Sequence, residues 1–406
     1  MTPAPHGLAS LARSPNSLAP HYSRFVVAER LLLTGHSHQA WPDVALDGQL
    51  EAWTDAATHV DEKWGRAAEK AGRVRRGFAR LLGDDPANIV LGASTHELVV
   101  RFLSALPLEH RPRLVTTDGE FHTLRRQLDR LSETGRIEVV KVAASPAETL
   151  AERLALALDD RTAALFVSSV LFLSGRIVPG LDRVASACRK HGAELLVDAY
   201  HHLNVVPFAL ASLGLEDVFA VGGGYKYVQL GEGNCFLRVP PGRDQLFPVI
   251  TGWFSEFAAL TERPAGRVPY GEGAARWAGS TYDPTSHYRA ASVFDFFAAQ
   301  NLTVDLLREV SRHQVGRLAE RFDALDLDPR VLSRDRSAPL EAFGGFLAVT
   351  GPRAGDLSGA LKSRGVGTDF RGTTLRLGPA PYLCDDQLDR AIDLLGLVVR
   401  ELPDAR

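Results

Sequence analysis

From about residue 87 to residue 239 the chain alternates between short apolar runs and longer amphipathic stretches, and no other feature constrains its fold as strongly. The runs have the length of strands, and the stretches between the earlier runs repeat apolar residues at helical spacing. Strands are expected at 88–91, 113–117, 137–142, 163–170, 193–197, 217–221 and 234–239. Helices are expected at 98–106, 123–133, 148–158 and 181–191. This alternation predicts βαβ units, and so an α/β fold whose mostly parallel sheet is covered on both faces.

The later part of the chain has a different pattern. The last two strands follow each other without a clear helix between them, so part of the sheet is expected to be antiparallel. Two long helical stretches, at 284–301 and 304–325, follow a segment rich in glycine, proline and aromatic residues. The tail predicts a small α+β unit, with strands at 345–349 and 374–377 and helices at 356–363 and 385–402. We expect a large domain at 41–280 and a small C-terminal domain at 281–406. The N-terminal segment, 1–40, is expected to be part of the small domain.

Composition excludes several classes of protein. The 46 basic and 49 acidic residues of the 406 nearly balance, and no basic run is present, which argues against a dedicated nucleic-acid binder. No apolar stretch approaches the roughly 18 residues that a membrane-spanning helix needs, and the N-terminus lacks the apolar core of a secretory signal. The three cysteines, Cys188, Cys235 and Cys384, are too far apart for a disulfide framework or a paired-cysteine metal site, which favours a reducing cytoplasm.

One of the six lysines has an unusual context. Lys226 follows an apolar run and three glycines, Gly222 to Gly224, and lies between Tyr225 and Tyr227. Burial disfavours the ammonium form and lowers the pKa of a lysine, which prepares the amine for Schiff-base chemistry. The glycines are expected to let the backbone approach a bulky ligand closely. A surface position is usual for lysine, but an apolar and glycine-rich context is not typical of the surface.

Two strand ends earlier in the chain lie where ligands bind in parallel sheets. Ser94 and Thr95 follow the first strand, and the spacing from Ser94 to Glu97 predicts a capping box at the start of a helix. Free backbone N–H groups and two hydroxyls suit a phosphate there, although a plain helix cap explains them equally well. Phe121 follows the second strand, where a ring stacks on a planar cofactor or, more often, simply packs. No Walker loop or G-x-G-x-x-G motif follows any strand.

Asp198 ends a strongly apolar strand, where a carboxylate is unfavourable unless a cation pairs with it. A pyridinium or a metal ion meets that need, and so does a salt bridge to an arginine. His201 and His202 beside it, and His36 with His38, raise the question of a metal site. Neither group has the spacing of an HExxH helix, so no metal is expected.

Together these features match the needs of pyridoxal phosphate. Asp198 would keep the pyridine nitrogen protonated, so that the ring acts as an electron sink. Lys226 would bind the cofactor covalently and later transfer protons, while Phe121 would stack on its ring. Ser94 and Thr95 would hold its phosphate. Each signal is weak alone, but their order along the chain makes the combination specific.

At these positions the sequence resembles the class V aminotransferase group of fold-type I pyridoxal-phosphate enzymes, and within it kynureninase. Lys226 lies in a Y-K-Y segment identical to that family's core, and Phe121 lies in E-F-H-T, similar to its E-x-F-P-T. Asp198 and His201 lie in D-A-Y-H, similar to its D-L-A-H. The resemblance implies that Lys226 carries the cofactor and that Tyr225 lies near the phosphate. It also implies that Asp198 binds the pyridine nitrogen and that His201 lies beside the ring.

The resemblance extends to the substrate and to a partner subunit. Residues 31–37 are similar to the family's L-D-G-N-S segment, and residues 367–371 and 375–381 are similar to its G-D-F-R and R-F-G-x-x-P segments. This implies that Arg376 clamps the α-carboxylate of a small amino-acid substrate, a task suited to a guanidinium. The family also implies an obligate homodimer with shared active sites, in which Ser280 and Thr281 reach the partner's phosphate.

The substrate pocket departs from the family. Its S-x-V-N-Y-R-S-G segment reads S-S-V-L-F-L-S-G at 168–175, without the asparagine and the arginine, and Phe254 replaces a tryptophan. A pocket that loses polar contacts is expected to bind a different side chain. The sequence therefore predicts a kynureninase-like hydrolase with an altered pocket, or a class V aminotransferase that uses the same cofactor residues.

Two other readings are weaker. A cysteine desulfurase needs a thiol on a loop shortly before the carboxylate-binding arginine, and residues 365–376 contain no cysteine. A non-catalytic binding protein on this fold usually lacks the cofactor lysine, and Lys226 is present.

Overall fold

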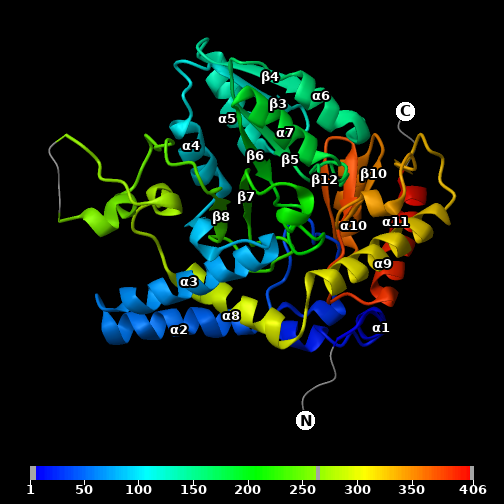
Figure 1. The fold of residues 1–406 in the computed structure, drawn as a ribbon. Helices are drawn as coiled ribbons and strands as arrows, with labels where there is room; N and C mark the ends of the chain where they lie inside the picture. The colour runs from blue at the N-terminus through cyan, green and yellow to red at the C-terminus, as the bar shows by residue number, and fades with distance from the viewer. Residues whose placement is uncertain (1–5, 262–265, 403–406) are drawn as a thin grey trace.

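A seven-stranded sheet forms the centre of the computed structural model, which describes residues 6–261 and 266–402 (Figure 1). Its strands lie in the order β2-β8-β7-β6-β5-β3-β4. Neighbours from β7 to β4 are parallel, whereas β8 is antiparallel to both β7 and β2. The expected mostly parallel sheet with an antiparallel part is thus confirmed. The strands are β2 (Ile89–Gly92), β3 (Arg113–Thr117), β4 (Glu138–Val142), β5 (Thr162–Ser168), β6 (Glu194–Asp198), β7 (Phe219–Gly223) and β8 (Cys235–Arg238).

Helices cover both faces of this sheet because successive strand residues point to opposite sides. Phe166 of β5 packs on Phe102 of α4 with ring centroids 5.7 Å apart, and α5 shares that core. Leu165 and Val167 belong to the core on the other face, with α6 and α7. These helices are α4 (Thr95–Ala105), α5 (His122–Glu133), α6 (Leu150–Leu156) and α7 (Leu181–His191).

Three long helices form a further layer beside the antiparallel strands (Figure 1). Phe78 of α3 contacts both Phe236 of β8 and Phe294 of α8, with ring centroids 4.6 and 5.5 Å apart. Gly77 lies under the ring of Phe294, where a Cβ atom would collide with it. The layer consists of α2 (Val44–His59), α3 (Lys63–Leu82) and α8 (Thr285–Ala299), of which the sequence predicted only the last.

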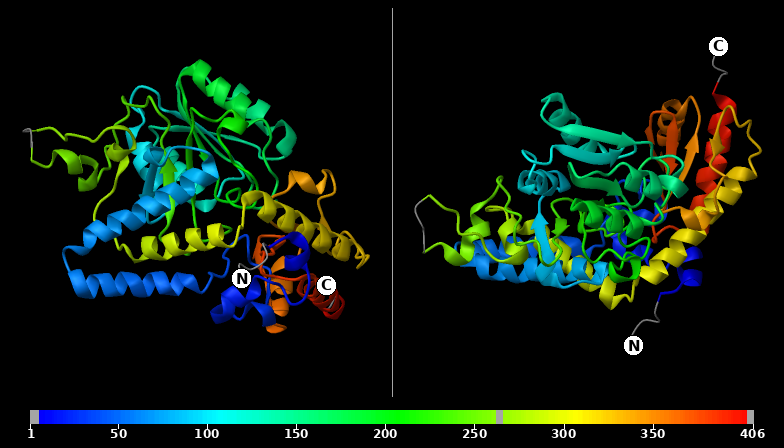
Figure 2. Two further views of the ribbon diagram at one scale, coloured as in Figure 1. Left: turned by 60° about the horizontal axis from the view of Figure 1, so that its bottom comes forward. Right: turned by 45° about the horizontal axis from the view of Figure 1, so that its top comes forward.

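A smaller sheet, in the order β12-β13-β10-β9, forms the C-terminal part. The N-terminal segment lies beside it in every view, where β1 pairs in parallel with β11 (Figures 1 and 2). This part of the structure contains a two-stranded sheet, formed by β1 (Leu31–Leu32) and β11 (Val366–Gly367), and the four-stranded sheet of β9 (Ser333–Arg334), β10 (Leu347–Thr350), β12 (Asp369–Arg371) and β13 (Thr374–Leu377). Its helices are α1 (Leu8–Ala12), α9 (Val304–Asp323), α10 (Ala354–Ser363) and α11 (Asp385–Glu401).

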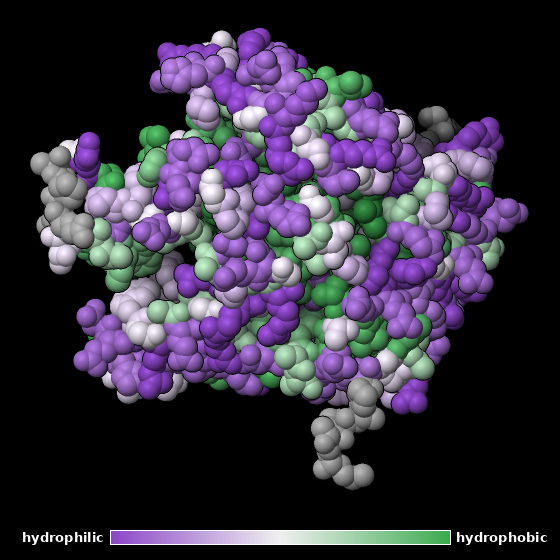
Figure 3. Space-filling model, in the orientation of Figure 1, coloured by the Kyte–Doolittle hydropathy of each residue, from purple (hydrophilic) through white to green (hydrophobic). Residues whose placement is uncertain are grey.

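A segment made of residues 240–261 and 266–281 projects from the body at the left of Figure 1. It carries exposed apolar side chains, among them Val249 and Phe257 with exposed fractions of 80% and 61%. Figure 3 shows green apolar residues at the left of the molecule, on the side from which this segment projects. None of the described helices is both long and apolar enough to cross a membrane.

Candidate active site

Lys226 lies just past the end of β7, in a loop that folds back on itself. The N–H of Gly224 donates to the carbonyl of Asn234, and the N–H of Leu230 donates to that of Gly224, each at 2.8 Å. These bonds fix the loop and turn the lysine side chain inward, where it is 5% exposed. Its Nζ atom lies 3.0 Å from Nε2 of His201.

Aromatic rings surround the amine of Lys226. Its Nζ atom lies 4.6, 5.3 and 5.7 Å from the ring centroids of Tyr200, Phe121 and Tyr225. Burial lowers the pKa of Lys226 to about 7, an effect that the charge of Asp198 only partly opposes. A large fraction of the amine is therefore neutral near pH 7 and able to act as a nucleophile or base.

The glycines before Lys226 are required by the protein itself. A Cβ atom on Gly223 would lie 2.6 Å from Sγ of Cys235, and one on Gly224 would lie 2.6 Å from Cβ of Leu230. The packing of the protein itself thus accounts for these two glycines, and close approach of a ligand, the reason expected from the sequence, stays a prediction. The run lets β7 and its loop pack against the neighbouring strand.

Asp198 ends β6, the strand next to β7, and its carboxylate is only partly buried. Oδ1 accepts a hydrogen bond from the N–H of Tyr200 at 2.8 Å. Burial raises the pKa of Asp198, while this hydrogen bond and the positive charge of Lys226 lower it. The carboxylate and the amine therefore act on one another across adjacent strand ends.

Glu120 is a buried carboxyl beside Phe121 that the sequence analysis did not select. It accepts hydrogen bonds from the N–H and hydroxyl of Ser168, at 3.1 and 2.6 Å, and from the hydroxyl of Thr117 at 2.8 Å. Burial raises its pKa to about 7, against these hydrogen bonds, and Asp198 adds to the rise. Glu120 lies three residues after the end of the apolar strand β3, so an acid near a strand end was the available signal, similar to the one that identified Asp198 at the end of β6.

The start of α4 lies close to the aromatic rings that surround Lys226. Ser94 caps the helix by accepting from the N–H of Glu97 at 3.2 Å, as the spacing predicted. The Glu97 carboxylate accepts in return from the N–H of Ala93 at 3.1 Å. The thiol of Cys235 lies at the Thr95 backbone and 3.9 Å from the Tyr200 hydroxyl, so this helix start is near the rings that enclose the lysine.

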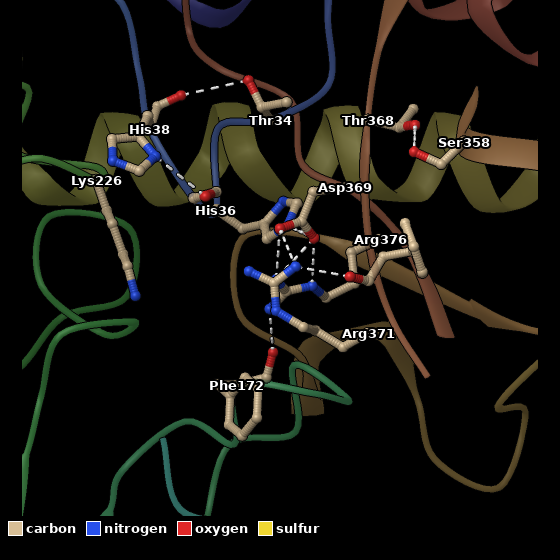
Figure 4. Close-up of polar contacts among 12 residues, drawn as sticks. Thr34, His36, His38, Phe172, Lys226, Ser358, Thr368, Asp369, Arg371 and Arg376 are labelled. Atoms are coloured by element: carbon tan, nitrogen blue, oxygen red, sulfur yellow. Dashed lines mark hydrogen bonds and ion pairs between the residues drawn. The ribbon is translucent and has the colours of Figure 1, made fainter. Parts of the chain in front are cut away.

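Arg376 enters the same pocket from β13 of the small sheet and is held by an ion pair (Figure 4). Its Nε and Nη2 atoms donate to the two carboxylate oxygens of Asp369, each at 2.8 Å. Its Nη1 atom donates to the carbonyl of Phe172 at 2.7 Å. Arg371 also points to Asp369, with its Nη1 atom 3.2 Å from Oδ2 (Figure 4).

His36 from the N-terminal segment completes this network. Its Nε2 atom lies 3.1 Å from Oδ1 of Asp369, and its Nδ1 atom is buried without a hydrogen-bond partner among the described residues. Burial lowers the pKa of His36 to about 4, so the imidazole is neutral at pH 7. Burial alone would raise the pKa of Asp369, but His36 and Arg376 lower it to about 2. His38 instead stacks on Tyr225, with ring centroids 4.7 Å apart.

Ser280 and Thr281 lie apart from the lysine. They line a cavity of about 880 Å³ together with Ala93 and Glu97 at the start of α4. The hydroxyl of Thr281 accepts from Nε1 of Trp253 at 3.2 Å. Their expected role toward a partner subunit remains a prediction.

The adjacent histidines face different ways. His201 faces Lys226, whereas Nε2 of His202 lies 3.2 Å from the carbonyl of Pro207. Burial lowers the pKa of both imidazoles well below the usual value. In residues 6–261 and 266–402, no three His, Cys, Asp or Glu side chains are grouped in a way that could hold a metal ion.

The gathered groups fit an aldehyde cofactor that has a ring nitrogen and a phosphate. Lys226 supplies an amine that is neutral near pH 7, and Asp198 supplies a partly open carboxylate at the next strand end. Phe121 supplies a ring face, and the exposed Ser94 begins a helix whose first N–H groups suit a phosphate.

Known proteins with similar sequences point the same way. No family model matches the chain. It is 27% identical over 350 residues to isopenicillin N epimerase of Streptomyces clavuligerus, which covers 81% of this chain and 84% of that one. It is 24% identical over 351 residues to the uncharacterized aminotransferase YcbU of Bacillus subtilis, which covers 85% and 88% of the two chains. These relatives support the expectation of an enzyme, and neither is a kynureninase.

Solved structures match the whole architecture at low sequence identity. A mutant of C-DES with glycine covalently linked to its PLP cofactor has a TM-score of 0.82 at 15% identity, covering 93% of this chain and 98% of that one. The apo cysteine desulfurase of Thermococcus onnurineus has a TM-score of 0.80 at 15% identity, covering 96% and 99%. The chain therefore has the expected fold, the fold-type I architecture of the pyridoxal-phosphate-dependent enzymes.

Proposed function

We propose that this chain is a pyridoxal-phosphate-dependent enzyme that acts at the α-carbon of an amino acid, with Lys226 as the cofactor lysine. The observation that carries the proposal is the surroundings of that amine. It is buried among aromatic rings beside Asp198, and its pKa is lowered to about 7 by burial. The names of the similar proteins, an epimerase and an aminotransferase, support the same class of chemistry.

Four groups of the chain would hold the cofactor. Asp198 would bind the ring nitrogen, Phe121 would stack on the ring, and Ser94 and Thr95 would hold the phosphate at the start of α4. Tyr225 would donate a hydrogen bond from its hydroxyl to the phosphate. This hydroxyl stays protonated because burial raises its pKa to about 12. When bound, pyridoxal phosphate withdraws electrons from the α-carbon of an amino acid and so weakens the bonds to that carbon.

The chain's own residues would bind the substrate and move its proton. Arg376 would bind the α-carboxylate, since its charge is fixed and its position is set by Asp369. Lys226 would take the α-proton, because a base whose pKa is near the working pH transfers protons efficiently. His201 would orient the amine from 3.0 Å, and it is neutral because burial lowers its pKa.

We propose transamination as the first candidate reaction. Residues 168–175 lack the asparagine and arginine of the kynureninase-like segment. Leu171 and Phe172, which stand in this segment, are apolar and buried. Apolar side chains give no hydrogen bond to a leaving group. Kynureninase-like hydrolysis is the second candidate. The Tyr225 hydroxyl is protonated at neutral pH and would be the proton donor during bond cleavage.

A desulfurase reaction is disfavoured in spite of the similar fold. It needs a thiol that reaches the substrate, but all three cysteines are buried. Cys384 lies at the start of α11, and Cys188 lies on α7 at the far face of the sheet.

We propose further that the protein works as a homodimer with shared active sites. The projecting segment exposes Val249 and Phe257, and α2 exposes Trp53, so a large apolar surface lacks cover in the single chain. Ser280 and Thr281 lie in the cavity next to this segment, from which they would reach a partner's phosphate. Light scattering of the purified protein tests the assembly, and a monomer would contradict it.

Reconstitution tests the central proposal. The protein is incubated with pyridoxal phosphate, reduced with borohydride and weighed by mass spectrometry. Wild type should gain the mass of the cofactor at Lys226, and Lys226→Ala should not. Product analysis with kynurenine, and with amino acids plus a keto acid, separates the reactions. Anthranilate indicates hydrolysis and a new amino acid indicates transamination, whereas failure to bind the cofactor would overturn the proposal.

A further inference from the structure

A group of arginines lies at the outer end of the pocket and has no role in the cofactor site. Helix α5 begins at His122, and helix residues three and four positions apart share a face, which puts Arg125 and Arg126 on the side of His122. The His122 ring lies 5.3 Å from the ring of Phe121 and 5.8 Å from that of Phe172. These arginines therefore stand one aromatic layer outside the buried lysine.

The small sheet brings two more guanidinium groups to the same place. Arg376 donates to the carbonyl of Phe172, whose ring meets His122, and Arg371 shares the carboxylate of Asp369 with it. Burial lowers the pKa of the His122 imidazole, and the nearby positive charges lower it further. Those charges, in decreasing order of effect, belong to Arg125, Arg371, Arg126 and Arg376.

The positive charge of this group is not balanced. Asp369 is already held at both oxygens by Arg376, and Arg125 is paired with an aspartate of its own helix. Arg371 is half-exposed, and its only polar contacts among the described residues are the shared contact to Asp369 and a hydrogen bond to the carbonyl of Phe370. Arg126 is exposed and contacts no hydrogen-bond or ion-pair partner within the described part of the chain. Arg126 and Arg371 are thus exposed guanidinium groups near His122 whose charge no carboxylate of the described residues fully balances.

We propose that the substrate is an amino acid whose side chain ends in a second carboxylate, which Arg126 and Arg371 receive. This inference rests on the proposed function, because it assigns the α-carboxylate to Arg376. Phe172 lies between the two anion positions, because its carbonyl contacts Arg376 and its ring meets His122, and its apolar side chain suits the methylene groups that separate two carboxylates. A neutral side chain of equal length would leave both outer cations unpaired.

Matched pairs of amino acids test the proposal. The holoenzyme is titrated with glutamate and glutamine, and with aspartate and asparagine, while the absorbance of the bound cofactor reports binding. The members of each pair differ mainly in charge. An exposed ion pair is worth up to about 1 kcal/mol, which corresponds to about fivefold in affinity, so with two arginines available the acid of at least one pair should bind about fivefold more tightly than its amide. The preference should shrink as salt is added.

Variants assign the preference to the two arginines. In Arg126→Gln with Arg371→Gln, the ratio of acid to amide affinity should fall toward one. Arg189→Gln is the matched control, because Arg189 is a half-exposed arginine on α7 at the opposite face of the sheet, and it should keep the wild-type ratio. Equal affinities in the wild type, or a preference that survives the double substitution, overturn the proposal. Failure of the proposed function would appear earlier, as a protein that binds no cofactor.

Discussion

Lys226 and Arg376 are buried cations of one pocket, 5% and 3% exposed, but their surroundings are opposite. The lysine amine meets ring faces and the neutral imidazole of His201, whereas Asp369 binds one edge of the guanidinium through both of its oxygens. Burial lowers the pKa of Lys226 to about 7, although the charge of Asp198 partly opposes this effect. The pKa of about 2 at Asp369 keeps the other pair charged across the working pH range.

The difference shows how one pocket can contain both a reactive group and a fixed anchor. A buried cation that changes its charge near neutral pH can accept and release a proton. A buried cation that is paired cannot, but it holds its position and orients whatever anion it binds. Breaking each arrangement in turn should therefore have effects of different kind and size.

Removal of the isolated amine should have the largest effect. Lys226→Ala should lower turnover about a thousandfold or more, because it removes both the covalent attachment and the base. Steady-state product formation by the holoenzyme measures the loss. Lys362→Ala, a change of an exposed lysine on α10, should leave turnover unchanged. Equal activity of the two variants would contradict the role of Lys226.

Removal of the counter-ion from the fixed pair should mainly affect stability. Asp369→Asn leaves Arg376 buried without a negative partner, and breaking a buried pair in this way costs about 3 kcal/mol of unfolding free energy. Urea denaturation of the cofactor-free protein measures the change. Glu341→Gln breaks the half-exposed pair to Arg312 and should cost at most about 1 kcal/mol. Similar losses in both variants would show that Asp369 acts only as a surface charge.

The sequence predicted the isolated amine better than the fixed pair. Lys226, Asp198 and Phe121 follow apolar strands, and the carboxyl ends of parallel strands necessarily meet at one edge of a sheet. Local pattern was therefore enough to bring them together. Asp369 was visible only as part of a family-like segment, and its two-point grip on Arg376 depends on the register of β12 against β13.

Other features depend on contacts that are distant along the chain. His36 meets Asp369 because β1 pairs with β11, which follows it by more than three hundred residues. Strands of only two residues are too short to be predicted from a sequence pattern. Helices α2 and α3 precede the alternation of strands and helices that predicted the large sheet. They are stabilised by packing on α8, which is distant along the chain. Glu120 was not predicted because it lies in the turn three residues after β3, whereas Asp198 is the last residue of its strand.

The pH dependence of stability should follow the isolated amine. An unfolded chain keeps a lysine protonated up to about pH 10.4, while the folded chain releases the Lys226 proton near pH 7. The unfolded state thus binds more protons between these values, so stability should rise with pH by up to about 1.4 kcal/mol per unit. The difference in unfolding free energy between wild type and Lys226→Met, both cofactor-free, isolates this contribution. A difference that stays constant from pH 7 to pH 9 would mean that the amine is not perturbed.

The smallest effect is expected at His36, which touches the fixed pair without adding charge to it. Its pKa of about 4, lowered by burial, means that it contributes one neutral hydrogen bond to Asp369 at pH 7. His36→Gln can replace that bond, so the KM for an amino acid should rise only about twofold to fivefold, the equivalent of 0.5–1 kcal/mol. Turnover at saturating substrate should not change, because Arg376 keeps both of its bonds to Asp369. A large fall in turnover would mean that the imidazole itself takes part in the reaction, and that the fixed side of the pocket also supplies a group that moves protons.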